Sequence, residues 1–375
     1  MVMVQPVKKN ELAITAILAA VLILLLVLKV DRITMDNPQF LLGDNLNYYG
    51  MAADEPGPHP APFCYRILVP SLVKVLPFSL ETGFFLQTLF FIWGSAIILF
   101  LVLRELGENR FFALSGMVLY LGLNWAAKFT IWDFWLTDAA LFFFGISAFY
   151  ATVRNNLAAL VIVVTLGVMA KEAMLFALPL YYGYHARKFL DWRLAGKTFL
   201  AGLIPLGLVL TLRALIPYSN HYDLPVLFRE LGIPRVTTDL VGNIWGGTTG
   251  TWGVMVLLLA ILGIRREPRL RRAALFFLPF VYLQPMFAKN LDRLLVFGFV
   301  IVIPLAVAGL RWFAAKYQLA AWMTIGYVAL PFLFLLWKTG YMSASREQQL
   351  IGLAVWSIVV FVARWKKSGP VPDTS

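Results

Sequence analysis

The feature that most constrains this chain is a series of apolar segments, each about as long as a bilayer is thick, that runs through the whole sequence. A helix needs about 20 apolar residues to cross the hydrocarbon core, with a range of about 17–25. Such segments lie at residues 12–30, 83–104, 111–129, 134–153, 198–216, 248–264, 273–288, 294–310, 319–337 and 349–364. The sequence is 60% hydrophobic and 14% charged, unlike a soluble domain. We therefore expect an all-α polytopic membrane protein with about 10–12 transmembrane helices in a single transmembrane domain, residues 1–375.

Two segments do not fit the simple pattern of one helix per span. Residues 157–186 would form one helix of about 45 Å, which is longer than the roughly 30 Å hydrocarbon core. Lys171 and Glu172 lie at its middle, so we expect a hairpin of two short helices with this pair at its tip. Residues 66–79 contain Pro70 and Pro77, which break a straight helix and predict an interfacial or re-entrant one.

The distribution of charge gives the expected orientation. Cytoplasmic loops of membrane proteins carry an excess of Lys and Arg. With a cytoplasmic N-terminus and a hairpin at residues 157–186, most of the 32 basic residues fall inside, including the run RREPRLRR at residues 265–272. A single span would move that run outside. We therefore expect an integral, multi-pass protein with both termini in the cytoplasm and with loops 31–82 and 217–247 on the outer face.

The formal net charge of +12 does not by itself identify a partner. Basic stripes occur in nucleic-acid-binding proteins and also at the cytoplasmic ends of membrane helices. Here the basic residues lie at the ends of the apolar segments rather than on one face. We therefore expect membrane lipids as partners and no nucleic acid.

The outer loops collect a particular set of polar residues. Ionisable side chains at membrane depth are costly, so they tend to line polar cavities and mark functional sites. The candidates are Asp44, Tyr48, Arg66, Asp133, Asp138, Lys171, Glu172 and Arg293.

Each of the first two charged candidates has a structural alternative. Asp44 can cap a short helix that extends through Ala52, or it can act as a general base on an acceptor hydroxyl. Arg66 can extend to the lipid headgroups while its stem stays in apolar surroundings, or it can bind a phosphate through two parallel hydrogen bonds. The residues alone leave both pairs of alternatives open.

The later candidates have alternatives of the same kind. Arg293 can pair with Asp292 or Asp239, or it can contact a phosphate. Lys171 and Glu172 can form a simple pair that caps their turn, or they can belong to a phosphate site.

Asp138 lies at the outer end of a span with acidic and aromatic neighbours. Asp133, Trp132 and Trp135 precede it closely. An acid in that position is hard to explain by core packing, whereas the two tryptophans are explained most simply as an interfacial aromatic belt.

Several kinds of chemistry lack their motifs. The sequence has no HExxH, GxSxG or Walker A motif, no paired Cys or His metal site, and no closely spaced Asp-x-Asp in an outer loop. Cys64 is the one cysteine, so no intrachain disulfide can form. Zinc chemistry and nucleophilic catalysis are therefore disfavoured, and a divalent metal has no paired acidic motif to hold it.

Four stretches together resemble a known family. They are LLGDNLNYYGMA early in the first outer loop, PFCYRILVP at its end, AKEAMLFALPL in the middle of the chain, and DRLLVFGFVIVIPLA late in the chain. Their order and common side are similar to the GT-C class of polytopic glycosyltransferases, in the small bacterial integral-membrane branch that depends on polyprenyl-phosphate sugars. The resemblance implies a GT-C-like helical bundle with short re-entrant or outer-loop helices in a bacterial inner membrane.

The resemblance also implies roles for the candidates. Asp44 would be the catalytic base. Arg66, Lys171 and Arg293 would bind the donor phosphate, and Glu172 would orient Lys171. Supporting or sugar-binding roles would fall to Tyr48, Asp133, Asp138 and Glu172.

The expected function is transfer of a sugar from a polyprenyl-phosphate donor to an acceptor on the extracytoplasmic side, by inverting displacement and without a cofactor. The alternatives are a membrane transporter or lipid flippase, and a non-catalytic membrane assembly protein. A transporter often has internal repeats, and the two halves of this sequence show no convincing repeat. The sugar, the acceptor and the oligomeric state are not encoded in any motif.

Overall fold

The computed structural model describes residues 7–42, 44–220, 228–287, 291–337, 339 and 346–365, and its regular structure over those ranges is helical, with no strand. Within these ranges five helices are long and apolar enough to cross a membrane, namely Lys9–Val27, Leu80–Glu105, Trp192–Leu215, Val241–Ile264 and Leu291–Lys316. Shorter apolar helices lie between them. The predicted all-α polytopic membrane fold is confirmed.

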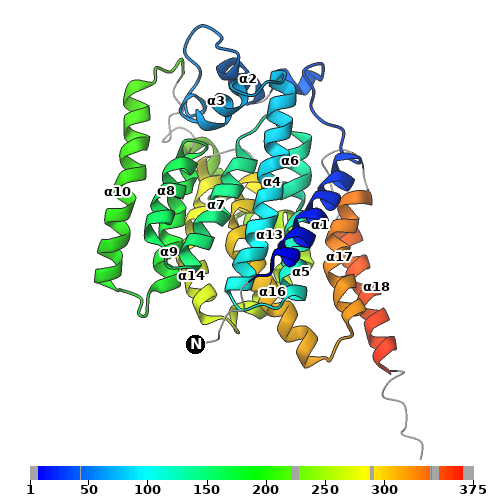
Figure 1. Cartoon of the computed structure of the whole chain (residues 1–375). Coiled ribbons are helices and arrows are strands. Elements are labelled where there is room, and N and C mark those ends of the chain that lie inside the picture. The colour runs from blue at the N-terminus through cyan, green and yellow to red at the C-terminus, as the bar shows by residue number, and fades with distance from the viewer. Residues whose placement is uncertain are drawn as a thin grey trace, which may run out of the picture.

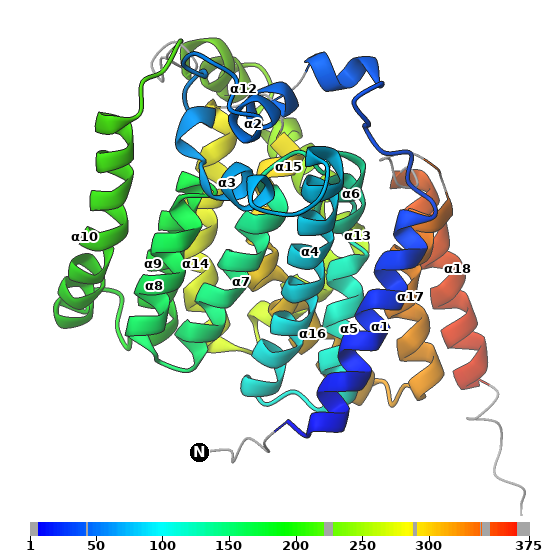
Figure 2. The same cartoon turned by 45° about the horizontal axis from the view of Figure 1, so that its top comes forward.

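The main helices run alternately up and down in one bundle (Figure 1). They are α1 (Lys9–Val27), α4 (Leu80–Glu105), α5 (Arg110–Leu121), α7 (Asp138–Val153), α8 (Leu157–Val168), α9 (Ala177–His185), α10 (Trp192–Leu215), α13 (Leu240–Ile264), α14 (Pro268–Leu283), α16 (Phe299–Lys316), α17 (Ala321–Trp337) and α18 (Arg346–Trp365). The start of α1 and the end of α18 lie at the same end of the bundle, the lower one in Figures 1 and 2. Each segment that was predicted to span the membrane overlaps with one of these helices.

Local capping fixes where several of these helices begin. The side chains of Ser79, Asn109, Asn156, Asp191 and Asp239 each accept a hydrogen bond from the backbone N–H three residues later. Such caps satisfy backbone donors that have no partner inside the helix. The turning points of the bundle are therefore set by short polar residues at the ends of the apolar segments.

The buried axis of the bundle is α16, which packs closely against α13. A Cβ atom on Gly263 of α13 would lie 1.9 Å from the carbonyl oxygen of Leu305 in α16. In the reverse direction, a Cβ atom on Gly309 of α16 would lie 1.9 Å from the carbonyl oxygen of Leu259. The two backbones are in direct contact here, as small residues permit in membrane helices.

Residues 157–186 form the predicted hairpin. Between α8 and α9 the backbone is extended at Lys171, with φ −165° and ψ 131°, and it then forms a 3-10 turn over Glu172–Phe176. The backbone N–H of Leu68 donates to the carbonyl of Met169 at 3.0 Å, which ties the hairpin tip to the segment after the first outer loop.

The second irregular segment is also short, as predicted. It forms α3 (Leu68–Lys74), whose first turn holds Pro70, a position where a missing N–H costs no helical hydrogen bond. Together with α2 (Asn45–Ala52), α3 lies across the end of the bundle at which α4 begins (Figure 2). These two short helices cover the end to which the hairpin tip belongs.

Candidate functional site

A chain of ion pairs joins three buried side chains and one partly exposed carboxylate. Asp138, the first residue of α7, accepts a hydrogen bond from Lys171 Nζ at 2.6 Å and one from Arg293 Nε at 2.7 Å. Arg293, in α15 (Leu291–Leu295), also lies 3.4 Å from the carboxylate of Asp44. Four residues that are far apart in the sequence therefore meet at one end of the bundle.

A second chain lies beside the first. Arg66 donates to the hydroxyl of Tyr48 at 2.8 Å and pairs with the carboxylate of Glu172 at 3.3 Å. Glu172 in turn lies 3.9 Å from a guanidinium nitrogen of Arg213, at the end of α10. Lys171 and Glu172 link the two chains because they are consecutive residues of the hairpin tip.

Asp138 and Asp44, the two acids of the first chain of ion pairs, differ in how far their side chains are exposed to solvent. The Asp138 side chain is 1% exposed, whereas the Asp44 side chain is 31% exposed. Asp138 is therefore an internal counter-ion for two cations. Asp44 has access to molecules outside the protein, and that access is what a general base needs.

The structure shows which contacts Asp44 and Arg66 of the first loop make. Asp44 does occupy the N-cap position of α2, but its side chain makes no capping hydrogen bond and pairs with Arg293 instead. Arg66 is buried and directed at Tyr48 and Glu172, so it does not extend to the lipid headgroups. Neither residue fits its structural alternative.

The proposed pairing of Arg293 with its neighbours is not observed either. Asp292 contacts α13, where its carbonyl accepts a hydrogen bond from Thr251 at 3.2 Å. Asp239 caps α13 through the N–H of Gly242 at 2.8 Å. The described contacts of Arg293 are with Asp138 and Asp44.

The expectation that Glu172 orients Lys171 differs from what the structure contains. Lys171 pairs with Asp138, and Glu172 pairs with Arg66 and Arg213. The reason is the extended backbone at Lys171, because successive side chains of an extended segment point in opposite directions. The two residues are also not a simple pair that caps their own turn.

Burial shifts the proton affinity of groups at this end of the bundle. Burial raises the pKa of Asp133, in the turn between α6 (Phe129–Trp132) and α7, to about 7, although nearby Arg293 opposes the change. Burial also raises the pKa of the Tyr48 hydroxyl. Burial lowers the pKa of Lys171 to about 8, and Asp138 opposes that change. Asp133 thus exchanges its proton near neutral pH.

The interpretation of the two tryptophans as an interfacial belt is wrong for Trp135. Its indole is fully buried, donates to the carbonyl of Ile33 at 2.7 Å, and packs against Phe40 and Phe84 at ring distances of 4.8 and 5.2 Å. Trp135 is a core residue that fixes the turn before Asp138. Trp132 is only partly buried.

Sequence reasoning missed Arg213 and Asn45. Arg213 stands over the Tyr65 ring at 5.7 Å and is 48% exposed at the side chain. It was detectable in principle, because a basic residue at the outer end of a span departs from the positive-inside pattern. Asn45 lies next to Asp44 and interacts with Asp133. Among the described residues, nothing donates to Asn45 Oδ1, which is shielded from solvent.

The second predicted outer loop, residues 217–247, is described only in part. Residues 221–227 lie outside the described part of the chain. In the described remainder, Arg235 donates to the carbonyl of Pro285. The cluster therefore draws on the first loop, the hairpin tip, and the ends of α7, α10 and α15.

No arrangement that suits a metal ion appears in the parts of the chain that the structure describes. Those residues contain no group of three or more His, Cys, Asp or Glu side chains placed to hold one. The cluster instead combines four cationic side chains with acids of unequal exposure. It can bind an anion and take up a proton.

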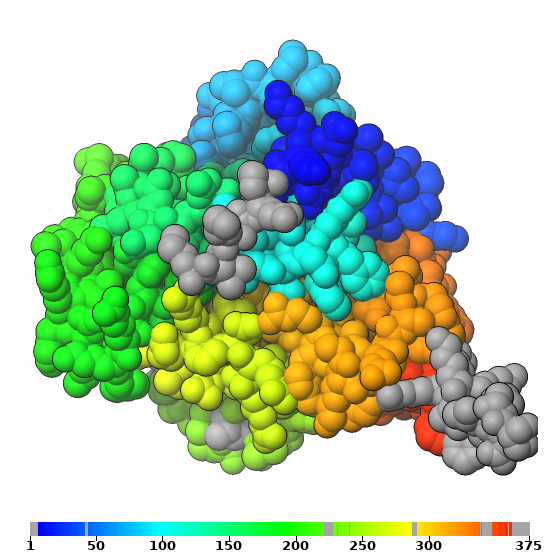
Figure 3. All heavy atoms as spheres, turned by 60° about the horizontal axis from the view of Figure 1, so that its bottom comes forward, coloured from blue at the N-terminus to red at the C-terminus, as the bar shows by residue number. Residues whose placement is uncertain are grey.

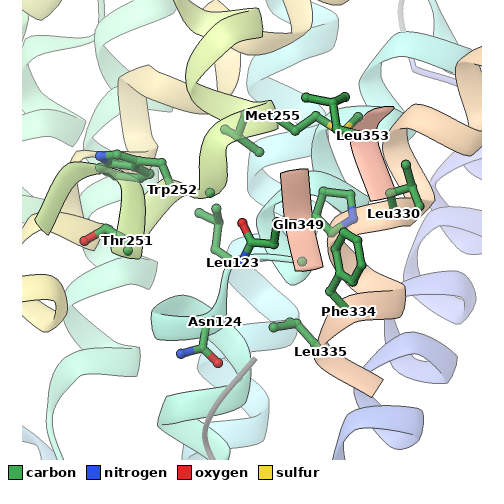
Figure 4. A pocket seen from close by; sticks show the side chains of 15 residues that line it. Leu123, Asn124, Thr251, Trp252, Met255, Leu330, Phe334, Leu335, Gln349 and Leu353 are labelled. Carbon is green, nitrogen blue, oxygen red and sulfur yellow. The ribbon is translucent and has the colours of Figure 1, made fainter. Parts of the chain in front are cut away.

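A separate small cavity of about 40 Å³ lies where helices are interrupted. There α13 kinks at Gly253, with φ 70°, and α17 contains Pro331. Figure 4 shows Asn124, Trp252 and Gln349 around this space. The residues described as lining it are uncharged, and it is large enough for water but too small for a sugar ring. It is not part of the ion-pair cluster.

Comparison of the sequence with protein-family models gives no match, and comparison with curated proteins gives none either. The fold and the site define the class of the protein, which is a polytopic helical membrane protein with a buried cluster of ion pairs at one end.

Proposed function

We propose that this protein is an integral-membrane glycosyltransferase that moves a sugar from a polyprenyl-phosphate donor to an acceptor hydroxyl. The observation that supports this most is the contrast between Asp44 and Asp138. Asp44 is accessible and lies beside a buried cation, whereas Asp138 is inaccessible and balances Lys171 and Arg293. An accessible carboxylate next to preorganised cations is what a displacement at a phosphate-linked carbon requires.

The proposed step is a single displacement. The acceptor oxygen attacks the anomeric carbon of the sugar and forms the new glycosidic bond. The bond between that carbon and the phosphate oxygen breaks, and its electron pair leaves with the lipid phosphate. The hydroxyl proton passes to the carboxylate of Asp44. The configuration at the anomeric carbon is inverted.

The charge that develops on the leaving phosphate is the larger electrostatic problem. In this proposal Arg66, Lys171 and Arg293 bind the phosphate, and we add Arg213, which is more exposed than the others. Cations already fixed by Tyr48, Glu172 and Asp138 need little reorganisation during the reaction. Preorganised charge of this kind is usually the largest contribution to catalysis.

Arg293 has a second role in the proposal. It bridges Asp138 at 2.7 Å and Asp44 at 3.4 Å. It therefore positions the base relative to the hairpin tip, and Asp138 keeps both cations charged. Tyr48, Asp133 and Glu172 support the site or contact sugar hydroxyls.

We further propose that this end of the bundle faces the outside of a bacterial inner membrane and that both termini are cytoplasmic. The support is that RREPRLRR, at residues 265–272, forms the turn after α13 and the start of α14 at the opposite end, where the positive-inside rule expects it.

The decisive variant is Asp44→Asn. Purified protein is incubated with a synthetic polyprenyl-phosphate hexose labelled in the sugar, and isolated membranes supply the acceptor. We expect sugar transfer to fall by at least about 100-fold, the usual contribution of a general base. Asp54→Asn is the matched control, since Asp54 lies in the same outer loop with a side chain 67% exposed and paired with Lys74. Full activity of Asp44→Asn would remove Asp44 as the base.

The same experiment separates transfer from transport. A transporter or flippase moves labelled lipid across the membrane with its sugar still attached, and it has no need of a carboxylate that accepts the proton of the acceptor. Unchanged donor together with transbilayer movement in the native protein would contradict the glycosyltransferase proposal.

A further inference from the structure

An apolar groove of about 470 Å³ lies between α9, α10 and α14, on the side of the bundle where α10 stands outermost (Figure 1). Its walls include Leu175 and Tyr182 from the hairpin, Phe199 and Leu206 from α10, and Phe280 from α14. The α10 side chains at Phe199 and Leu206 are themselves exposed. A membrane protein has no water at this surface, so the groove faces lipid chains.

The length of the groove matches one leaflet of a bilayer. Its α10 wall runs from Ala195 to Leu206, which is about 16 Å along a helix. One leaflet contributes about 15 Å of the hydrocarbon core. A single acyl chain anchored at the lower end of the groove would therefore fill it.

The residues that line the groove are uncharged, but basic residues lie close in the sequence to those at its lower end. Arg272 and Arg269 precede the groove residue Phe276 by four and seven positions on α14, so all three lie on one face of the helix. Lys188 is adjacent to Phe189, which closes the groove from the loop before α10. Figure 3 looks onto this end, where the surface of α8 to α10 meets that of α14.

Arg272 has a donor that the protein leaves unused. Its Nε is shielded from solvent, and within the described ranges no group accepts a hydrogen bond from it. A buried donor of this kind is costly without an acceptor. A phosphate oxygen is the acceptor that suits a guanidinium best.

We propose that this groove binds an anionic glycerophospholipid from the leaflet at the lower end of the bundle, with its phosphate on Arg272 and one acyl chain along α10. The upper end suits this lipid less well. Leu206 lies seven residues before Arg213, about 10 Å along the helix, and Arg213 already pairs with Glu172. At the lower end, Arg272 lies one helical turn before the groove residue Phe276 on α14. This inference does not depend on the proposed sugar transfer.

The first test measures lipid retention by native mass spectrometry. The full chain is reconstituted in nanodiscs of equal phosphatidylglycerol and phosphatidylethanolamine and then transferred to detergent. We expect preferential retention of phosphatidylglycerol and, for Arg272→Gln, a loss of about fivefold in its affinity, the contribution of one basic residue near a membrane surface. Lys316→Gln is the control, because Lys316 lies at the same end of the bundle but stands over Trp312 on α16. Equal retention of the two lipids would overturn the proposal.

The second test fills the groove itself. Gly202→Leu places a side chain against Leu178, because a Cβ atom there already lies 2.8 Å from Leu178 Cδ1. Gly207→Leu is the matched control on the same helix, where a Cβ atom meets nothing within 4 Å. We expect Gly202→Leu to lose the retained phospholipid and Gly207→Leu to keep it, with both variants unfolding at similar temperatures.

Two outcomes of this second test would contradict the proposal. One is retention of the phospholipid by Gly202→Leu at the native level. The other is a retained polyprenyl phosphate whose binding depends on Arg213 rather than on Arg272, which would make the groove a site for the chain of the sugar donor.

Discussion

Replacing Asp138 by Asn removes the negative charge that holds two buried cations. One carboxylate oxygen accepts from Lys171 at 2.6 Å and the other from Arg293 at 2.7 Å, and the side chain is 1% exposed. Asn keeps one acceptor and turns the other oxygen into an N–H donor that faces a cation. Breaking a buried ion pair in this way costs about 3–5 kcal/mol. That is a large part of a typical free energy of unfolding of about 5–15 kcal/mol.

Thermal unfolding of the purified protein in detergent measures this cost, and we expect a clear fall in the unfolding temperature. Asp54→Asn breaks the exposed pair with Lys74 and serves as the comparison, with an expected cost of at most about 1 kcal/mol. The double variant Asp138→Asn, Lys171→Met removes the stranded ammonium and lets the Asn oxygen accept from Arg293. It should be more stable than Asp138→Asn alone, and comparison with both single variants should give a coupling free energy of about 0.5–3 kcal/mol. Equal stability of Asp138→Asn and the native protein would refute the assignment of Asp138 as the counter-ion of both cations.

Three further predictions concern packing, pH and topology. Gly309→Ala should destabilise the protein in the same unfolding assay by about 1–3 kcal/mol or more, because its Cβ would lie 1.9 Å from the Leu259 carbonyl oxygen. Gly196→Ala is the control and should leave the unfolding temperature unchanged, because a Cβ atom there meets nothing within 4 Å. The raised pKa of Asp133 means that the folded state binds its proton more tightly than the unfolded state, so its contribution to stability is complete below about pH 4 and is lost as the pH rises through about 7. Asp133→Asn should therefore flatten the decline in unfolding temperature over that range, and an unchanged pH profile would contradict the shift. Under the proposed orientation, Lys74→Cys should react with a membrane-impermeant maleimide in intact cells and Lys316→Cys only after permeabilisation; the reverse pattern would invert the topology.

The sequence predicted the spans and the set of residues at the site, and both predictions rest on the same physical rule. Charge is costly in an apolar environment, so the few ionisable residues near the outer ends of the spans had to find partners. Asp44, Arg66, Asp138, Lys171 and Arg293 do meet in the structure. Their catalytic and binding roles stay a prediction.

The pairing within that set could not be predicted from the sequence. Lys171 and Glu172 are adjacent, but the extended backbone at Lys171 directs them to different partners. A tertiary hydrogen bond from Leu68 to Met169 holds the chain two residues before Lys171, and such a contact between distant segments is not visible in the local sequence. Trp135 was misassigned for a similar reason, because its burial depends on Phe40 and Phe84 from distant segments.

The contact between α13 and α16 has a mechanical consequence. At Gly263 and Gly309 the two backbones touch with no side chain between them that could change rotamer and absorb a displacement. Packed elements of this kind shift as one rigid body rather than deforming continuously. The peripheral helix α10 differs, because its apolar face is largely exposed and fewer of its side chains are held by neighbouring helices. Arg293 lies on the segment directly before α16, whereas Arg213 lies on α10. A displacement of α10 against the rigid pair would therefore separate Arg213 from the other cations of the cluster.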